Sequence, residues 1–316
     1  MRRQPPPWRR TCGAFAVAFA STFAACGDGS DRAYRGRSAR QWASQLSASS
    51  TRDRIAAAEA LYHIAPRSNE VVVALVAAMR DTSGEVQSSA AVALSTVGVR
   101  AVPGLIEALG DDHESVRMIA LTLLAERGAD AAPAAPAIAR LLADVSEQVR
   151  LAAAQALQRI GPAARDAEPS LLKAARQGSP SLRAAALQAL IANDAEPQPL
   201  TPVLERALHD SIAAIRSAAV KSAVASRILP TDALAMIIPL TNDRDATVRQ
   251  AAFRGLGRLL GSPNTEARAR ALLLKGTTDS NTTVRDIARR ALTPVPVGNS
   301  EQEPRRTGAF PRGLPQ

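Results

Sequence analysis

The chain has 316 residues, of which 46% are hydrophobic and 3% aromatic, and its 39 Lys and Arg against 29 Asp and Glu give a formal charge of +10. Aromatic side chains this few and scattered exclude a platform on which bases or sugars stack. Acidic and basic residues are mixed along the middle of the chain, whereas a nucleic-acid groove needs clustered positive charge. Both cysteines, Cys12 and Cys26, lie near the N-terminus, so the remainder has neither a disulfide framework nor a cysteine metal site.

Residues 1–25 have the pattern of a secretory signal peptide, a basic segment (1–10) followed by an uncharged one (11–25). The uncharged segment is shorter than the about 20 residues that a membrane-spanning helix needs. The motif Phe23-Ala24-Ala25-Cys26 resembles the bacterial lipobox, which implies that Cys26 is lipidated and becomes the mature N-terminus. The alternative is an ordinary cleaved signal followed by an incidental cysteine.

Lipidation at Cys26 predicts a protein of the cell envelope that is anchored to a membrane and faces the periplasm or the exterior. Several acyl chains on one residue hold a soluble domain on a membrane firmly. Residues 26–37 are then a flexible tether, because they are rich in glycine and charge. At the other end, residues 294–316 are rich in Pro and Gly and lack hydrophobic periodicity, which predicts a disordered tail.

Between residues 38 and 293 one pattern recurs eight times, mostly at 33-residue intervals. It is marked by Arg54, Gln87, Arg117, Arg150, Arg183, Arg216, Arg249 and Arg285. Three residues after each of these positions stands an alanine, and seven residues after it a leucine in all copies but one. A fixed period in the range of 20–50 residues predicts a solenoid of stacked repeats.

Each copy is predicted to hold two helices, here called helix A and helix B, joined by a short turn. Pro103, Pro136, Pro169 and Pro202 are expected to mark starts of helix A, because proline is tolerated in the first helical turn. The spacing V-R-x-x-A-x-x-x-L, as in residues 149–157, places Val, Ala and Leu on one face of helix B. Two intervals of 30 and 36 residues place a deletion near 97–102 and an insertion near 261–266, in loops between repeats.

Six residues before the arginine position the copies share an aspartate. These residues are Asp81, Asp111, Asp144, Asp210, Asp243 and Asp279, while Ala48 and Gln177 break the column. In one interpretation the aspartate caps a turn and the arginine is a solvated helix residue. In the other, aspartate and arginine pair within or between repeats and form a ladder along the stack. Both roles are structural.

Residues that start and stop helices support this division. Ser38 and Gln41 have the spacing of a capping box, and Ser179-Pro180 fits the start of a helix B. Gly98, Gly128, Gly161 and Gly261 follow helix B, where a left-handed conformation favours glycine. The copy at 194–226 is predicted to be the least stable, because Ala223 replaces the leucine and Asn193-Asp194 replaces the preceding glycine.

Segments such as 111–128 (DDHESVRMIALTLLAERG) and 144–161 (DVSEQVRLAAAQALQRIG) resemble the short bacterial HEAT-type repeats called PBS-lyase HEAT-like repeats. The resemblance covers roughly residues 38–293. It implies an all-α fold, an α-solenoid of about eight helical hairpins, with helix B on the concave face and helix A on the convex face. Some members of such families modify proteins or excise bases, but the metal-ligand His-Glu pairs of the hydroxylase type are missing here.

No catalytic arrangement, metal site or cofactor is predicted, since His63, His113 and His209 fall at different repeat positions. The sequence therefore favours a non-catalytic scaffold that binds a protein or peptide on the concave face. The expected contacts are polar positions of helix B, and we count among them Gln87, Arg117, Arg150, Gln155, Arg183, Gln188, Arg216 and Arg249. Two alternatives stay open: a cytoplasmic protein of modification or nucleic-acid binding, and a structural spacer without a ligand.

Overall fold

The structure is a computed structural model that describes residues 33–64 and 68–293. Within these residues the chain forms eight consecutive pairs of α-helices and no β-strand, which confirms the all-α prediction. Helix A of each pair is α1 (Ala39–Gln45), α3 (Asn69–Ala78), α5 (Val102–Ala108), α7 (Ala135–Arg140), α9 (Glu168–Gln177), α11 (Pro197–Leu208), α13 (Pro230–Ile237) or α15 (Pro263–Gly276). Helix B is α2 (Thr51–Ile64), α4 (Gly84–Val97), α6 (Glu114–Arg127), α8 (Glu147–Ile160), α10 (Pro180–Ala192), α12 (Ala213–Ala225), α14 (Ala246–Leu259) or α16 (Thr282–Leu292).

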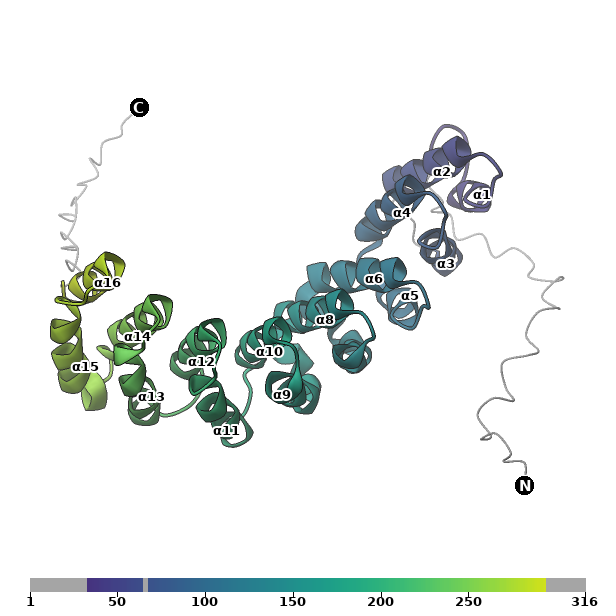
Figure 1. Ribbon diagram of the computed structural model, residues 1–316. Coiled ribbons are helices and arrows are strands. Elements are labelled where there is room, and N and C mark those ends of the chain that lie inside the picture. The colour runs from purple at the N-terminus through teal and green to yellow at the C-terminus, as the bar shows by residue number, and fades with distance from the viewer. Residues whose placement is uncertain (1–32, 65–67, 294–316) are drawn as a thin grey trace, which may run out of the picture.

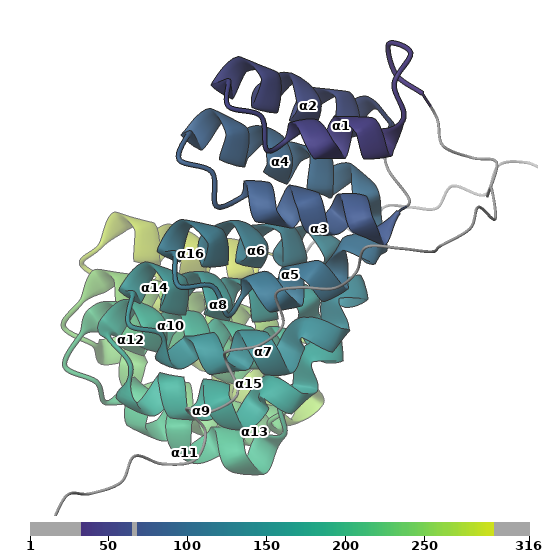
Figure 2. The same ribbon diagram turned by 90° about the vertical axis from the view of Figure 1, so that its right-hand side faces the viewer.

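The pairs follow one another along an arc, with the B helices on its inner side and the A helices on its outer side (Figure 1). Seen from the N-terminal end, the helices lie across the arc rather than along it (Figure 2). Each pair therefore contacts mainly its two neighbours, as in other solenoids. The concave face is a continuous surface made of helix B.

The alanine and leucine positions of the repeat pack in the core between helices. All eight alanines of the register are fully buried, from Ala57 in α2 to Ala288 in α16. The leucines four residues further along, such as Leu94 and Leu157, are equally buried except Leu292 in the last copy, and so is Ala223 in the copy that lacks the leucine. A small side chain lets two helices approach closely, while the leucine fills the space between them. The result is one core that continues along the arc.

At the first of the two irregular intervals, the loop between repeats is shorter, as predicted. Short 3₁₀ helices join three of the pairs to the next, and η3 (Gly128–Ala134) and η5 (Gly161–Ala167) each have seven residues. The corresponding η2 (Gly98–Ala101) has four, which accounts for the missing three residues. The insertion near 261–266 instead lengthens a helix, because α15 begins at Pro263 and runs for 14 residues.

Two expectations about helix ends were wrong. Pro202 does not start a helix but lies inside α11, which begins at Pro197 because this copy lacks the 3₁₀ helix that precedes α7 and α9. Gly261 has no positive φ, whereas Gly98, Gly128 and Gly161 do. In those three the chain turns directly out of helix B into a 3₁₀ helix, while α14 is followed by a looser turn.

At Gly161 the backbone adopts φ 70° and ψ −145°, a region that is essentially restricted to glycine. Gly161→Ala is therefore expected to lower the free energy of unfolding by about 1–3 kcal/mol. Gly261→Ala is the matched control, since no such angle constrains it, and it should change stability by less than about 1 kcal/mol. Urea denaturation followed by circular dichroism measures both, and equal effects of the two variants would contradict the strain at Gly161.

The position equivalent to Gly161 in the next repeat is Asp194, which also has a positive φ of 56°. A non-glycine residue at such an angle is strained. The neighbouring Asn193 is 1% exposed, and its side-chain oxygen has no hydrogen-bond partner among the described residues. The weak point predicted in the copy at 194–226 thus coincides with local strain at its start.

The N-terminal end of the arc is closed by residues that were predicted to belong to a tether. Tyr34 and Arg37 form a two-residue hairpin with backbone hydrogen bonds of 3.0 and 3.1 Å. The Tyr34 carbonyl accepts a hydrogen bond from the indole of buried Trp42. The Tyr34 ring stacks on the His63 ring with the two centroids 4.9 Å apart. The folded region therefore begins before residue 38, because an aromatic cap covers the first helix pair. The predicted capping box of Ser38 and Gln41 is confirmed.

One stretch of the described chain, Gly84–Ala108, is long and apolar enough by composition to cross a membrane. It is not a single α-helix: α4 ends at Val97, the chain turns at Gly98 with a φ of 72°, and α5 begins at Val102. Val86, Leu94 and Leu105 within it are fully buried in the core. Its hydrophobicity is explained by packing between repeats. The predicted signal peptide, Cys26 and the tail 294–316 lie outside the described residues.

Candidate functional site

Four arginines of the register, Arg54, Arg117, Arg216 and Arg249, join their own turn to the next repeat. In Arg216, Nη1 donates to the carbonyls of Asp210 and Ser211 at 2.8 and 3.1 Å. Its Nε and Nη2 donate to the two carboxylate oxygens of Asp243, both at 2.7 Å. A planar guanidinium is suited to such bidentate pairing. One side chain thereby ties the A–B turns of two successive repeats together.

The aspartate of the pair has a second contact within its own turn. Oδ1 of Asp243 accepts a hydrogen bond from the backbone N–H of Asp245 at 2.8 Å. The same contact recurs two residues after Asp81, Asp111, Asp144, Asp210 and Asp279. Turn capping and pairing between repeats, which the sequence offered as alternatives, are thus two functions of one carboxylate. The pairs made by register arginines are Arg54–Asp81, Arg117–Asp144, Arg183–Asp210, Arg216–Asp243 and Arg249–Asp279.

Two copies depart from this pattern. Gln87 replaces the arginine and keeps only the contact within the turn, to the carbonyl of Asp81 at 2.7 Å, while Arg80 pairs with Asp111 in its place. Arg150 contacts the carbonyls of Asp144 and Val145 but has no carboxylate in the next repeat. There Gln177 stands in the aspartate position, as the last residue of α9. Among the described residues, this is the junction at which the ladder is interrupted.

The ladder corrects the prediction that the arginine column binds a partner. The side chains of Arg117 and Arg216 are 9% and 7% exposed, and those of Arg183 and Arg249 are 19% and 12% exposed. The guanidinium groups of Arg117, Arg216 and Arg249 are held between carbonyls and carboxylates at the edge formed by the A–B turns, and that of Arg183 pairs with Asp210. Arg150 lies in the same place and is half-buried. Arg117, Arg183, Arg216 and Arg249 therefore tie neighbouring repeats together, and none of the five lines the concave cavity.

The ladder shifts the pKa of its carboxylates. The hydrogen bonds from arginine, followed by those from backbone N–H groups, hold the pKa values of Asp81, Asp243 and Asp279 below their ordinary value of 3.8, although burial opposes this. For Asp111, burial raises the pKa, but hydrogen bonds from His113 and Arg80 outweigh it. A carboxylate whose pKa is lower in the folded state stabilises that state fully only above the pKa of the unfolded chain.

Acidification below about pH 4 is therefore expected to lower the free energy of unfolding progressively, as the ladder carboxylates take up protons. Urea denaturation at a series of pH values measures this slope. In Asp243→Asn one of the linked carboxylates is missing, so its stability should depend less on pH in this range. An unchanged slope in that variant would show that Asp243 does not contribute to the acid sensitivity.

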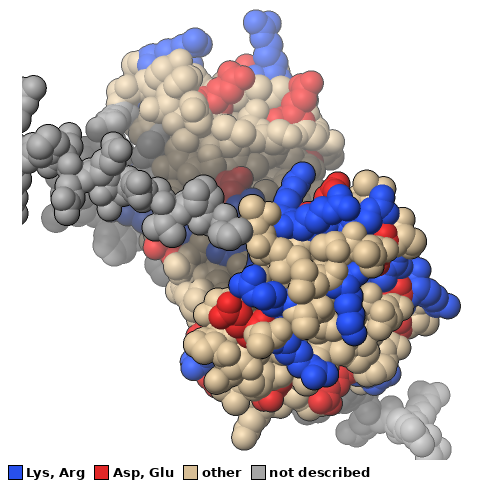
Figure 3. Space-filling model, turned by 90° about the vertical axis from the view of Figure 1, so that its left-hand side faces the viewer, with Lys and Arg blue, Asp and Glu red and all other residues tan. Residues whose placement is uncertain are grey.

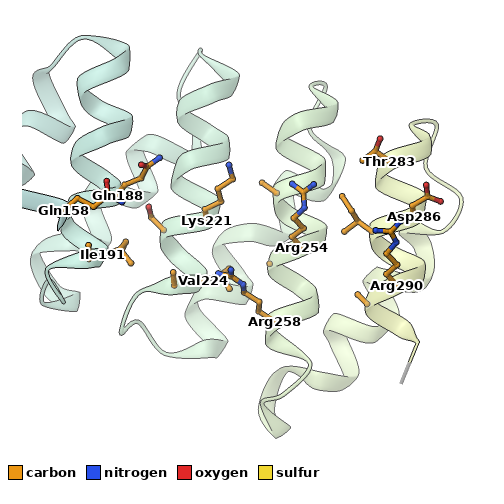
Figure 4. A pocket seen from close by; sticks show the side chains of 17 residues that line it. Gln158, Gln188, Ile191, Lys221, Val224, Arg254, Arg258, Thr283, Asp286 and Arg290 are labelled. Carbon is orange, nitrogen blue, oxygen red and sulfur yellow. The ribbon is translucent and has the colours of Figure 1, made fainter. Parts of the chain in front are cut away.

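The concave face carries a cavity of about 860 Å³ in its C-terminal half. Side chains of five successive B helices, α8, α10, α12, α14 and α16, line it and point to its open side (Figure 4). Ile191, Val224 and Ile287 supply an apolar floor. Lys221, Arg254, Arg258 and Arg290 supply positive charge, against Asp286 as the acidic residue of the lining.

Three of these cations share one repeat position. Lys221, Arg254 and Arg290 each follow the register arginine by five residues, and Gln155 and Gln188 occupy that same position in α8 and α10. The prediction had included the two glutamines but not the three cations. Gln188 lines the cavity, as does Gln158 one turn beyond Gln155, while Gln155 is exposed on the same helix. The signal that could have found the cations was the continuation of the glutamine column into later copies.

The N-terminal half of the concave face has a different character. A smaller cavity of about 320 Å³ is lined by residues of α4 and α6, including Val92, Met118, Ile119 and Thr122. Glu126 is its charged residue. The cavity of α4 and α6 is therefore apolar with one acidic residue, and the cavity that reaches α12, α14 and α16 has four cations against one carboxylate.

In the part of the chain that the structure describes, no cluster of three or more His, Cys, Asp or Glu side chains could hold a metal ion. The histidines have separate structural contacts. His63 stacks on Tyr34, Nδ1 of His113 lies 2.9 Å from Oδ1 of Asp111, and Nδ1 of His209 lies 2.9 Å from the Glu205 carbonyl. The concave cavity thus offers charge and apolar surface, and its geometry suits binding.

Comparison with known proteins defines the family. None of the curated proteins compared with this chain matches it. Among solved structures, YibA of E. coli is similar with a TM-score of 0.50 and 18% identity, over 80% of this chain and 90% of that one. Importin beta (TM-score 0.60, 17% identity) and Kap95 from a Kap95:Nup1 complex (0.59, 15%) are also similar over 80% of this chain, which spans 40% of their length. The sequence model of HEAT repeats matches residues 39–125, 102–191, 134–224 and 200–293, and the chain therefore belongs to the HEAT-repeat family.

Proposed function

We propose that this protein is a non-catalytic scaffold that holds a protein or peptide partner against its concave face. The observation that carries the proposal is the cavity across α8, α10, α12, α14 and α16, where exposed polar and apolar side chains face one open surface. Extended concave surfaces of stacked repeats suit the binding of peptides and proteins. The ladder of ion pairs supports this function, because it fixes the spacing of the B helices.

The structural neighbours add support of a general kind. Kap95p binds RanGDP and Kap95 forms a complex with Nup1, so those solenoids bind other proteins. At identities of 15–16% the likeness concerns the fold, and it does not extend to the identity of a partner. The similarity in fold supports only the general point that a helical solenoid of this geometry can present a binding surface.

Site-specific photo-crosslinking in cells tests this function. A photoreactive amino acid at Gln188, on the concave face, is expected to give discrete crosslinked species, while the same residue at exposed Lys173 of α9, on the convex face, gives none. A purely structural spacer would give crosslinks at neither position. Equal, diffuse labelling from both positions would contradict a specific concave surface.

We further propose that the protein is a bacterial lipoprotein anchored through Cys26 on the extracytoplasmic side of a membrane. The support is the sequence of residues 1–26, in which a basic segment, an uncharged segment and a lipobox-like motif follow in order. Mass spectrometry of the mature N-terminus, with palmitate labelling of wild type and Cys26→Ser, tests it. Acylated Cys26 would support the anchor. An intact, unlabelled Met1 would contradict it and favour a cytoplasmic protein that modifies proteins or binds nucleic acid.

A further inference from the structure

We infer that the C-terminal half of the concave face binds an acidic peptide segment, in the polyproline II conformation, whose carboxylates lie about 10 Å apart. This inference rests on the proposed scaffold function and specifies the chemistry of its partner. It concerns the surface formed by Lys221, Arg254, Arg258 and Arg290, here called the basic row.

The basic row is distinct from the arginines that hold the repeats together. Its four side chains are exposed, and none makes an ion pair with any residue that the structure describes. The register arginines Arg117, Arg183, Arg216 and Arg249, by contrast, are paired with aspartates. The positive charges of the basic row are thus not neutralised by ion pairs within the described residues. The C-terminal end of the arc also carries many Lys and Arg side chains, with Asp and Glu side chains between them (Figure 3).

The spacing of the row selects the geometry of a partner. Lys221, Arg254 and Arg290 occupy the same position on three successive B helices, α12, α14 and α16. Packed helices lie about 8–10 Å apart, so the cations are spaced by about that distance along the arc. A peptide in the polyproline II conformation has three residues per turn and rises about 3.1 Å per residue, which places side chains three residues apart on one face at about 9 Å. Acidic residues at every third position would therefore meet successive cations.

The helices of the row are held close by two glycines of α14. A Cβ atom on Gly255 would lie 3.0 Å from a methyl group of Val224, and one on Gly257 would lie 3.1 Å from Cβ of Ala291. Helix α14 thus approaches α12 on one side and α16 on the other closely. This approach keeps Arg254 near Lys221 and Arg290, so that one ligand can contact all three.

The remaining lining favours a peptide over a nucleic acid. Ile191, Val224, Ile287 and several alanines form the floor between the cations, and apolar side chains of a peptide can pack on them. No aromatic residue lines the cavity, so bases would have no stacking platform. The apolar cavity of α4 and α6 contains Glu126 and no cation, which confines a negative segment to the C-terminal half.

Fluorescence anisotropy with the full-length protein and three synthetic peptides, together with a fourth in which the acidic residues are clustered, tests this inference. The peptides have equal length and apolar content and carry Glu, Gln or Lys at every third position. The Glu peptide is expected to bind at least about tenfold more tightly than the other two. Its binding should weaken as salt is raised from 0.1 to 1 M, where the screening length falls from about 10 to 3 Å. A Glu peptide with its acidic residues clustered should bind more weakly.

Charge reversal identifies the surface. Lys221→Glu combined with Arg254→Glu is expected to weaken binding of the Glu peptide at least about tenfold and to strengthen binding of the Lys peptide. Arg206→Glu combined with Arg268→Glu, two exposed residues of α11 and α15, makes the same change of charge on helix A and should leave both affinities within about twofold. The gain of Lys-peptide binding distinguishes a redirected surface from an unfolded variant.

Different failures have different meanings. Preference for the Gln or Lys peptide would overturn the acidic specificity and leave the scaffold function in place. Tighter binding of a single-stranded oligonucleotide that displaces the Glu peptide would also overturn the acidic-peptide specificity. Binding of the Glu peptide that the concave and convex variants affect equally would overturn the assignment to the basic row. If no peptide binds and photo-crosslinking at Gln188 also gives no product, the proposed function itself fails.

Discussion

Asp243→Ala is expected to lower the free energy of unfolding by about 3 kcal/mol or more, the largest effect of any single substitution proposed for this chain. The side chains of Asp243 and Arg216 are 9% and 7% exposed, so the variant leaves a guanidinium group without its carboxylate in a site from which water is largely excluded. Breaking such a pair by removing one partner costs more than the pair contributes to stability, because the remaining charge stays buried. The variant also loses the cap on the backbone N–H of Asp245.

Urea denaturation followed by circular dichroism measures this loss, and hydrogen exchange locates it. Exchange should accelerate first at the junction of α12 and α14, since each repeat is stabilised mainly by its neighbours. Glu70→Ala is the control, because Glu70 and its partner Arg40 are 72% and 68% exposed. An exposed pair of this kind is worth about 1 kcal/mol or less. Equal losses in the two variants would show that burial does not determine the strength of the ladder.

Gly178→Ala is expected to destabilise the protein by about 2 kcal/mol through overpacking. A Cβ atom at this position would lie 2.7 Å from the carbonyl oxygen of Ala174 and 2.9 Å from the side chain of Leu182. The first neighbour is backbone and the second is buried in the core, so neither can move away without disturbing α9 or α10. The angles of Gly178, φ −70° and ψ 171°, are accessible to any residue, which isolates the steric effect from backbone strain.

Gly84→Ala provides the matched control for this prediction. Gly84 is the first residue of α4, and nothing lies within 4 Å of a Cβ atom built on it. The alanine should therefore be neutral or stabilise the fold by up to about 1 kcal/mol, since it lowers the entropy of the unfolded chain. Thermal or urea denaturation compares the two variants. Tolerance of Gly178→Ala would mean that the turn between α9 and α10 can open without cost.

The extent of α9, which runs through Gln177, also explains why the ladder is interrupted at its middle. In the neighbouring repeat the aspartate position, Asp144, is extended with φ −59° and ψ 154°, and its carboxylate faces the preceding arginine. In the copy with Gly178, α9 continues through Gln177, so the equivalent residue is helical. The missing pair with Arg150 therefore reflects a different turn as well as a different side chain. Substituting the aspartate alone at 177 would not reproduce the geometry.

A concave face that is apolar at one end and basic at the other is compatible with the ladder because the two use different positions of helix B. The register position faces the A–B turns and the following repeat, while the position five residues later faces the open side of the arc. Charge on the second position can change from Gln188 to Lys221 without affecting the stacking of repeats. The binding surface and the stability of the solenoid are thus encoded separately within one helix.

The sequence by itself determined the number of helix pairs, their boundaries to within a few residues and the buried positions, such as Ala153 and Leu157, because each repeat places the same small and large side chains against the same neighbours. It did not decide which arginines are available to a ligand. Arg216 and Arg254 are both polar helix B residues in sequence, yet one is enclosed by Asp243 and two carbonyls and the other lines a cavity. That difference arises from the curvature of the arc and the contact with the following repeat, which join residues about 30 positions apart and exist only once the helices are stacked.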